Sequence, residues 1–355
     1  MALPVTVLTG FLGSGKTTLL NHLVRQPALG DVAVIVNEFG EIALDHLLIE
    51  HSEENIALLR SGCLCCAVRG DLIQTLRELA SRRESGRVGF SRVIIETTGL
   101  ADPAPILHTL MVEPEIALRY HLEGVVTTVD AVNGAATLET HEEALKQVGM
   151  ADLIVLTKTD LAPAESSAAL TRRLAHLNRD ASIVAVADGS LDAAKIAAFG
   201  PYDAGAKSDD ARHWLDDAAA LETPARGGTV NGPADRPGHT EPEHRHADSV
   251  RTLSVVIDEP VRAQDFASWL ELMGAMRGEQ LLRLKGLLAT DEHPDRPLVI
   301  HGVQHIIHPV RLLDAWPSAD HRTRLVFITR DISPELIEQT LEKFAHVPRD
   351  AIEIR

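Results

Sequence analysis

The stretch Gly10-Phe11-Leu12-Gly13-Ser14-Gly15-Lys16-Thr17 decides how the first part of the chain folds. It follows the apolar, β-branched run Val5-Thr6-Val7-Leu8 and leads into a helical pattern that begins at Thr18. A strand, a glycine-rich turn and a helix with the spacing G-x-x-x-x-G-K-T are typical of a phosphate-binding loop. Glycines let successive backbone N–H groups point at phosphate oxygens, and the helix N-terminus adds partial positive charge. The stretch therefore predicts a bound nucleoside triphosphate.

Within this loop, Lys16 is expected to reach the β- and γ-phosphates and the Thr17 hydroxyl to bind Mg²⁺. The nucleotide-binding residues predicted here are Gly10, Gly13, Ser14, Gly15, Lys16, Thr17 and Thr18.

Composition limits the remaining choices. The chain has 355 residues, enough for two domains, and a 45% hydrophobic content that can form ordinary cores. A formal net charge of −17 argues against binding to nucleic acid or to an anionic membrane. No apolar run approaches membrane-spanning length, and the apolar start passes directly into the phosphate loop, as a first strand does. We expect a cytoplasmic protein with no nucleic-acid or membrane partner.

Buried apolar runs recur at residues 31–37, 56–59, 93–96, 125–130, 153–156 and 181–186, and helical patterns separate them. This alternation predicts an α/β fold in which a parallel sheet is wound with helices. Strand and helix patterns return between residues 253 and 344 and predict a smaller α+β domain. The predicted division is a nucleotide-binding domain at 1–205, a flexible histidine-containing linker at 206–249, and a C-terminal domain at 250–355.

The base is expected to be read by Thr157-Lys158-Thr159-Asp160, a variant of the guanine signature N-K-x-D at the end of a buried strand. Asp160 can accept hydrogen bonds from the N1–H and 2-amino groups of guanine, which adenine lacks. Lys158 would lie along the base, and Thr157 in place of asparagine predicts a weaker brace on the phosphate loop. This motif favours GTP and disfavours the rival interpretation, a kinase or ATPase.

Glu96-Thr97-Thr98-Gly99 follows another buried strand. Glu96 is expected to hold Mg²⁺ through water. Gly99 is expected to present a backbone N–H near the γ-phosphate and so to distinguish GTP from GDP. The predicted catalytic set is Lys16, Glu96 and Gly99. The alternative for Glu96 is an acid that caps the next helix.

The three cysteines of the chain lie together in Cys63-Leu64-Cys65-Cys66, which is no extracellular disulfide framework. Thiolates bind soft or borderline metals, so Cys63, Cys65 and Cys66 predict a Zn²⁺ site, with Co²⁺ as another ion that they accept. Glu38, Glu41, a histidine or a client residue could supply the fourth ligand. The alternatives are small buried side chains or a redox pair.

Two groups of histidines are weaker candidates. In the linker, His239, His244 and His246 form either an exchangeable metal site or a solvated loop. In the second domain, strand alternation would place His301 and His305 on one partly exposed face rather than at a metal.

Taken together, these motifs resemble the CobW-type GTPases, a branch of the P-loop GTPases that includes CobW proteins, nitrile hydratase activators and zinc-regulated metallochaperones. The resemblance rests on Gly10–Thr17, Asn37-Glu38-Phe39-Gly40-Glu41, Cys63–Cys66, Glu96–Gly99, Thr157–Asp160 and, in the second domain, Leu282-Arg283-Leu284-Lys285-Gly286.

The resemblance implies a P-loop GTPase domain followed by a CobW C-terminal domain. It implies slow, regulated GTP hydrolysis coupled to binding of a transition metal, zinc first, and its delivery to a client protein. It also implies homo-oligomers. Alternatives within it are a cobalt-inserting activator of the nitrile hydratase or cobalamin type, or a metal-buffering protein with little GTPase turnover.

Overall fold

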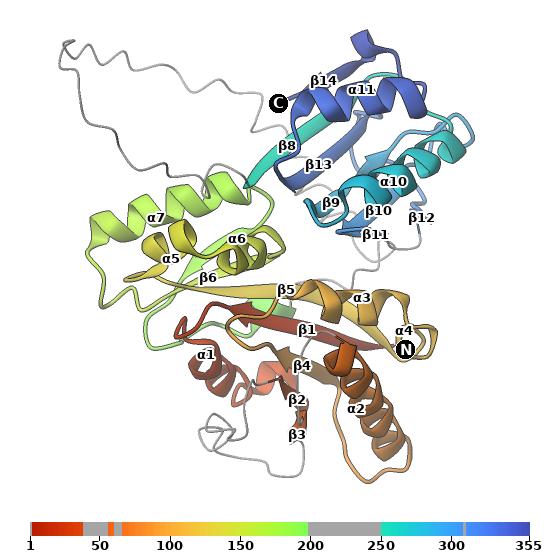
Figure 1. Cartoon of the computed structure of the whole chain (residues 1–355). Helices are drawn as coiled ribbons and strands as arrows, with labels where there is room; N and C mark the ends of the chain where they lie inside the picture. The colour runs from red at the N-terminus through yellow and green to blue at the C-terminus, as the bar shows by residue number, and fades with distance from the viewer. Residues whose placement is uncertain (1, 38–55, 60–65, 198–249, 308–309) are drawn as a thin grey trace, which may run out of the picture.

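The computed structural model describes residues 2–37, 56–59, 66–197, 250–307 and 310–355. Its N-terminal part is built on a sheet whose seven described strands are all parallel, in the order β3-β2-β4-β1-β5-β6-β7 (Figure 1). In chain order the strands are β1 (Leu3–Gly10), β2 (Val32–Asn37), β3 (Ile56–Leu59), β4 (Arg92–Glu96), β5 (Tyr120–Asp130), β6 (Leu153–Thr157) and β7 (Ser182–Ala185). Each lies at an expected apolar run, and the predicted α/β fold is confirmed.

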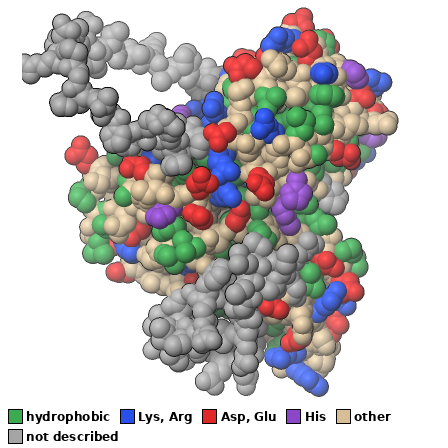
Figure 2. Space-filling view, viewed as in Figure 1, with side chains coloured by type: hydrophobic (Ala, Val, Ile, Leu, Met, Phe, Trp, Pro, Cys, Tyr) green, Lys and Arg blue, Asp and Glu red, His purple; other side chains and the backbone are tan. Residues whose placement is uncertain are grey.

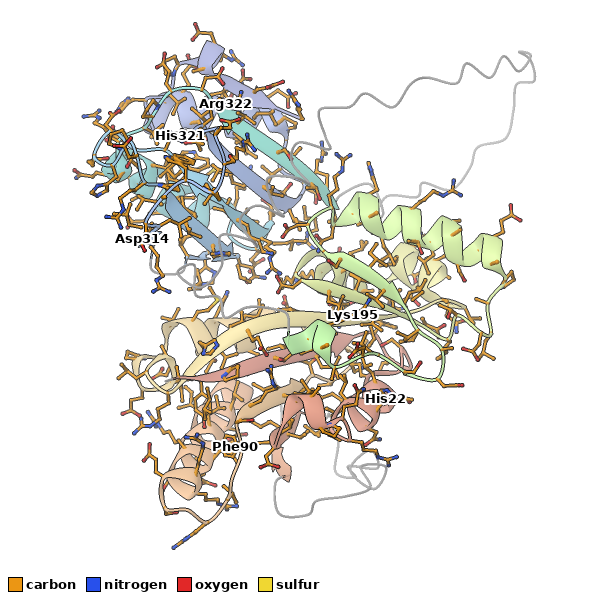
Figure 3. The ribbon with its side chains drawn as sticks, turned by 180° about the vertical axis from the view of Figure 1, so that it is seen from behind. His22, Phe90, Lys195, Asp314, His321 and Arg322 are labelled. Atoms are coloured by element: carbon orange, nitrogen blue, oxygen red, sulfur yellow. The ribbon has the colours of Figure 1, made fainter. Side chains whose placement is uncertain are left out.

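Helices cover both faces of this sheet. In chain order they are α1 (Lys16–Leu23), η1 (Pro27–Leu29), α2 (Cys66–Glu84), α3 (Ala104–Val112), α4 (Pro114–Ala117), α5 (Gly134–Thr140), α6 (Glu142–Gly149), α7 (Ala164–Leu177) and α8 (Ala194–Ala197). Side chains alternate along β1, so Val5 and Val7 join the core beneath α2, α3, α6 and α7, while Leu8 joins the core beneath α1 and α8. Figure 3 labels His22 of α1 and Lys195 of α8, the two helices that cover the face to which Leu8 belongs. Because both faces are covered, the strands read as nearly continuous apolar runs.

The C-terminal part is an antiparallel sheet with two helices on one face. Its strands are β8 (Val250–Ile257), β9 (Leu281–Leu288), β10 (Leu298–Val303), β11 (Ile306–Ile307), β12 (Arg311–Leu312), β13 (Thr323–Arg330) and β14 (Ile352–Ile354), and its helices are α10 (Ala263–Arg277), α11 (Pro334–Phe344) and the short η3 (Arg349–Ala351). Trp269 of α10 is fully buried, and its indole N–H donates to Thr340 Oγ1 of α11 at 3.0 Å. This arrangement confirms the predicted smaller α+β domain.

The histidine pattern in this domain differs from the prediction. The strand expected to continue to residue 305 ends at Val303, because Gln304 has a φ of 54° and the chain turns there into β11. His305 therefore lies in the turn and shares no strand face with His301, so the predicted alternation was wrong. Its ring instead meets the ring of His108 on α3, with centroids 4.8 Å apart.

The other face of the C-terminal sheet packs on the N-terminal part. Gly149 ends α6 so close to β9 that an added Cβ would lie 2.8 Å from Leu282 Cδ1. Asp152, just before β6, pairs with Arg283 and Lys285 of β9 at 2.5 and 2.9 Å. These two cationic side chains are only 3% and 8% exposed, so the seam between the parts contains buried ion pairs.

Charged contacts continue along this seam. Lys285 also pairs with Asp180 at 2.5 Å, and Arg330 of β13 reaches Glu142 of α6 at 2.7 Å. Figure 2 shows acidic and basic side chains gathered where the two parts meet. The predicted linker at 206–249 lies outside the described residues. Within the described ranges, no helix has the length and apolar character needed to cross a membrane.

Candidate nucleotide-binding site

The phosphate loop joins β1 to α1 and has the backbone that its glycines permit. Gly10, Gly13 and Gly15 have φ values of 141°, 71° and 91°, a region that other residues rarely adopt. A Cβ on Gly10 would also collide with Thr128 Oγ1 of β5 and lie 2.8 Å from Ser14 Oγ. Both the curl of the loop and its close approach to β5 therefore require glycine.

Lys16 is the first residue of α1, and its side chain turns back into the loop. Its Nζ donates to Gly10 O at 2.9 Å and to Phe11 O at 3.2 Å, and the residue is 9% exposed. The loop thus holds an ammonium group beside its own backbone, where a polyphosphate would gain most from the charge.

Thr17 and Glu96 come together although they are far apart in sequence. The Thr17 hydroxyl donates to Glu96 Oε1 at 2.9 Å, and Glu96, at the end of β4, is 4% exposed. β4 lies beside β1, with Leu8 opposite Glu96. A hydroxyl and a carboxylate are the hard oxygen donors that suit Mg²⁺, so the residues present fit that ion.

Gly99 packs directly on the phosphate loop. A Cβ placed there would lie 2.6 Å from the backbone nitrogen of Leu12. The Gln147 amide of α6 holds the same segment, because its Nε2 donates to Gly99 O at 3.2 Å and to Ala101 O at 3.1 Å. The segment after β4 is therefore held between the loop and α6.

The expected brace on the loop is made by Thr157. Its hydroxyl donates to Ser14 O at 2.7 Å, and the residue is 3% exposed. A threonine at the end of β6 thus reaches the loop despite the shorter side chain.

Lys158 and Asp160 follow the end of β6 at Thr157. Lys158 has a φ of 56°, and its Nζ pairs with Asp130 Oδ2 at 2.7 Å. Burial alone would raise the pKa of Asp130, but hydrogen bonds from Lys158, from the Asn133 side chain and from two backbone N–H groups keep that pKa below its usual value. Asp160 is exposed.

Several neighbours of the site were missed by sequence reasoning. Asp130 ends β5, Gln147 lies within α6, and residues 186–189 follow β7, where Val186 O accepts from the Thr159 hydroxyl at 3.0 Å and Gly189 packs on Thr18. The polar ends of two buried strands could have indicated Asp130 and residues 186–189. A single glutamine on an amphipathic helix carries no comparable signal.

The predicted zinc ligands, unlike Thr17 and Glu96, can be located only through the strands and helices next to them in the chain. Glu38, Glu41, Cys63, Cys65, His239, His244 and His246 lie outside the described residues, and Cys66 is described only as the first residue of α2. The strands that precede the two glutamates and the cysteines end at Asn37 and Leu59. Because the sheet is parallel, both ends lie at the same edge as Gly10 and Glu96.

This geometry defines a P-loop nucleotide-binding protein. Residues 4–185 match the family described as CobW/HypB/UreG, nucleotide-binding domain, and residues 250–345 match the cobalamin synthesis protein cobW C-terminal domain. The chain therefore belongs to the CobW family, and the predicted family is confirmed.

Sequence and structural similarity to individual proteins extends over nearly the whole chain. The zinc chaperone YjiA of Escherichia coli is 33% identical over 333 residues, which cover 94% of this chain and 96% of that protein. The crystal structure of Zn(II)-bound YjiA GTPase from E. coli matches with a TM-score of 0.67 and 27% identity, covering 97% of this chain and 99% of that one. A Zn(II)-bound YjiA triple mutant, with one glutamate and two cysteines changed to alanine, matches with a TM-score of 0.68, 28% identity and coverage of 97% and 99%.

Proposed function

We propose that the protein is a GTPase that couples GTP binding and slow hydrolysis to the binding of zinc and its delivery to a client protein. The observation that carries the proposal is the contact of Thr17 with Glu96 beside Gly99, at the sheet edge from which the cysteine-bearing segment also departs. The similarity to a zinc chaperone and to Zn(II)-bound GTPase structures supports the choice of ion and nucleotide.

In this proposal, residues of the chain have separate roles in GTP hydrolysis. Lys16 offsets negative charge on the β- and γ-phosphates, and Gly99 offers its backbone N–H to the γ-phosphate. Glu96 fixes the Thr17 hydroxyl and orients water at the end of β4. Mg²⁺ held by Thr17, and through water by Glu96, would neutralise phosphate charge when bound.

Zinc coupling in this proposal uses the neighbouring strand ends. Cys63, Cys65 and Cys66 supply thiolates, and Glu38 or Glu41 supplies a carboxylate. The segment with Glu38 and Glu41 follows β2, in which Val36 lies opposite Glu96, and the cysteine segment follows β3 on the far side of β2. In this proposal, engagement of the γ-phosphate changes the arrangement of the zinc ligands. Coupling free energies of this kind are about 1–3 kcal/mol, so GTP should change zinc affinity by roughly 5–150-fold, and zinc should change GTP affinity equally.

The decisive test is a competition titration of Zn²⁺ with Mg²⁺ and a non-hydrolysable GTP analogue, with Mg-GDP, and without nucleotide. Equal zinc affinity in all three states would refute the coupling. Zinc binds the YjiA triple mutant as well, so stoichiometry must be measured and only the tightest site compared. The variant Cys63→Ser/Cys65→Ser/Cys66→Ser should lose that tightest site and keep GTP binding. A parallel titration with Co²⁺ tests the alternative ion.

Base recognition has its own test. Asp160→Asn should shift preference from guanosine to xanthosine triphosphate, because the amide donates where the carboxylate accepted. A variant with unchanged GTP preference would contradict the assignment of Asp160.

We expect the protein to be a cytoplasmic homo-oligomer and to bind a client protein. Light scattering with and without GTP measures its oligomeric state. If His239, His244 and His246 gather metal, deletion of residues 206–249 should lower zinc loading at limiting metal. The same deletion should leave GTP hydrolysis in metal-chelated buffer with Mg²⁺ unchanged, and a loss of that hydrolysis would contradict the linker's role.

A further inference from the structure

The segment after β4 is bonded to one side chain of helix α6. The Gln147 amide nitrogen donates to Gly99 O at 3.2 Å and to Ala101 O at 3.1 Å, so both of its N–H groups are used. Gly99 also lies against the phosphate loop, where an added Cβ would come within 2.6 Å of the Leu12 backbone nitrogen. The glycine that is expected to sense the γ-phosphate is therefore bonded to α6 and packed on the loop.

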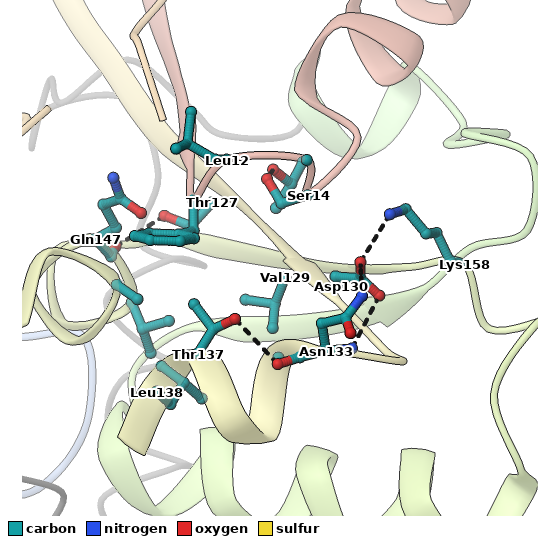
Figure 4. A pocket seen from close by; sticks show the side chains of 16 residues that line it. Leu12, Ser14, Thr127, Val129, Asp130, Asn133, Thr137, Leu138, Gln147 and Lys158 are labelled. Atoms are coloured by element: carbon teal, nitrogen blue, oxygen red, sulfur yellow. Dashed lines mark hydrogen bonds and ion pairs between the residues drawn. The ribbon is translucent and has the colours of Figure 1, made fainter. Parts of the chain in front are cut away.

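Gln147 is itself fixed to the sheet. Its backbone carbonyl accepts from the Thr127 hydroxyl of β5 at 2.8 Å, and Figure 4 labels both residues at the pocket beside the phosphate loop. β5 pairs with β1, the strand that leads into the loop, with Thr127 opposite Thr9. The amide thus relates the position of Gly99 to the strand that carries the phosphate loop.

Packing alone does not explain a glutamine at this position. The other buried side chains of α6 are apolar, at Ala144, Leu145 and Val148. Gln147 Oε1 is inaccessible to solvent and has no hydrogen-bond partner among the described residues. Burying this oxygen costs free energy that a leucine or methionine would not lose. The same burial prevents Oε1 from meeting a ligand, so the amide acts through the two carbonyls that it holds.

Gly99 is the residue on which such a hold has most effect. Glycine has more conformational freedom than any other residue, and a hydrogen bond to its carbonyl restricts rotation about its Cα–C bond. A second contact from α6 lies further along the segment, where Lys146 pairs with Asp102 at 3.0 Å. These two side chains are 22% and 29% exposed, so their pairing is the weaker hold. The position of Gly99 on the loop therefore depends mainly on Gln147.

We propose that Gln147 is a positioning residue that keeps Gly99 where its backbone N–H meets the γ-phosphate, and that it thereby sets the preference for GTP over GDP. This inference rests on the proposed function, in which Gly99 senses the γ-phosphate. Because GDP lacks that phosphate, loss of the hold should weaken GTP binding and leave GDP binding nearly unchanged.

The test uses Gln147→Met in the full-length chain. Methionine has nearly the same length and fills a similar volume, but it has no N–H to donate. Calorimetry in zinc-free buffer with Mg²⁺ measures the affinity for a non-hydrolysable GTP analogue and for GDP. The ratio of the two affinities should fall at least about fivefold, while GDP affinity should change less than about twofold. An unchanged ratio, or an equal loss for both nucleotides, would overturn the proposal.

Gln26→Met is the matched control. The Gln26 amide also makes two hydrogen bonds, from its Nε2 to Leu191 O at 2.7 Å and from the Ala193 N–H to its Oε1 at 2.8 Å. Both partners lie outside the segment after β4, so this variant should keep the affinity ratio of the unmodified chain. A fall as large as that of Gln147→Met would also reject the proposal, because loss of either glutamine amide would then have the same effect.

Two further measurements separate the possible failures. If Gln147→Met fails to fold by circular dichroism, Gln147→Leu removes the same donors, and failure of both to fold would assign the amide to folding and reject the positioning role. Absence of GTP turnover in the unmodified chain would reject the proposed function and this inference with it. Turnover together with an unchanged ratio in the folded variant would reject the role of Gln147 alone.

Discussion

Two aspartates at opposite ends of neighbouring strands make ion pairs of different character. Asp130 ends β5 and pairs with Lys158, whose side chain is 35% exposed. Asp152 precedes β6 and pairs with Arg283 and Lys285, which are 3% and 8% exposed. The first pair lies where a ligand or solvent can rearrange it, whereas the second is enclosed between two domains. An aspartate ion pair is thus free to rearrange at one edge of the sheet, the adaptable edge, and is held between the two domains at the other edge, the joint.

The largest expected effect comes from breaking the enclosed pair. Asp152→Ala removes the carboxylate that Arg283 and Lys285 share at the seam, where Lys285 keeps its pair with Asp180. It should lower the free energy of unfolding by about 3–5 kcal/mol. Asp130→Ala is the matched control and should cost only about 1–2 kcal/mol, because its partner can turn to water. Urea unfolding followed by circular dichroism measures both. Equal losses would show that the two pairs do not differ as described.

At the adaptable edge, Lys16→Ala should lower GTP turnover at least about 100-fold, equivalent to about 2.7 kcal/mol, by removing charge stabilisation of the phosphates. Phosphate release with saturating Mg-GTP measures the effect. Lys195→Ala, an exposed lysine on α8, should leave turnover unchanged. A Lys16→Ala variant with more than a tenth of the original turnover would contradict the role proposed for Lys16.

Acid should weaken the seam between the two domains by protonating Asp152. Burial alone would raise the pKa of Asp152, but the charges on Arg283 and Lys285 lower it from 3.8 to about 2. A depressed carboxyl pKa stabilises the fold above pH ~4, and this stability is lost as the pH falls toward about 2. The loss is about 2 kcal/mol, at about 1.4 kcal/mol per pKa unit.

Unfolding free energies measured between pH 5 and 2 test this expectation. The slope should become shallower in Asp152→Asn, which has no proton to bind at that position. An unchanged slope would mean that other carboxylates dominate acid unfolding.

The smallest expected effect is at the loop brace. Thr157→Val removes the hydroxyl that reaches Ser14 O and should weaken GDP binding about fivefold, roughly 1 kcal/mol. Thr171→Val on α7, whose hydroxyl bonds within its own helix, serves as the control and should bind GDP normally. Calorimetric titration with Mg-GDP distinguishes the two, and equal affinities would show that the brace does not support the nucleotide site.

Much of the fold was predictable because its signals are local. A strand buried on both faces must be apolar along its length, so the parallel strands could be located from their continuous apolar runs. The strands β11 and β12 are two residues long and too short to show a period. The position of His305 was mispredicted because the left-handed turn at Gln304 interrupts alternation.

The site was predictable only where the motif lies within one segment. The phosphate loop and the guanine-type loop are each contiguous, so their residue types and spacing can be recognised directly in the sequence. Asp130 and Gln147 are single polar residues whose partners lie elsewhere in the chain, at Lys158 and Gly99. No spacing rule connects such pairs, so they were found only from the coordinates.

The sequence by itself determined the phosphate loop, because eight adjacent residues contain the glycines, the lysine and the hydroxyl that the loop needs. Only the tertiary structure decided which distant residues complete it. The order β4-β1-β5 brings Glu96 to Thr17 across 79 positions and Thr128 to Ser14 across 114. Strand pairing depends on burial across the whole sheet, and that is a property of the packed chain rather than of any one segment.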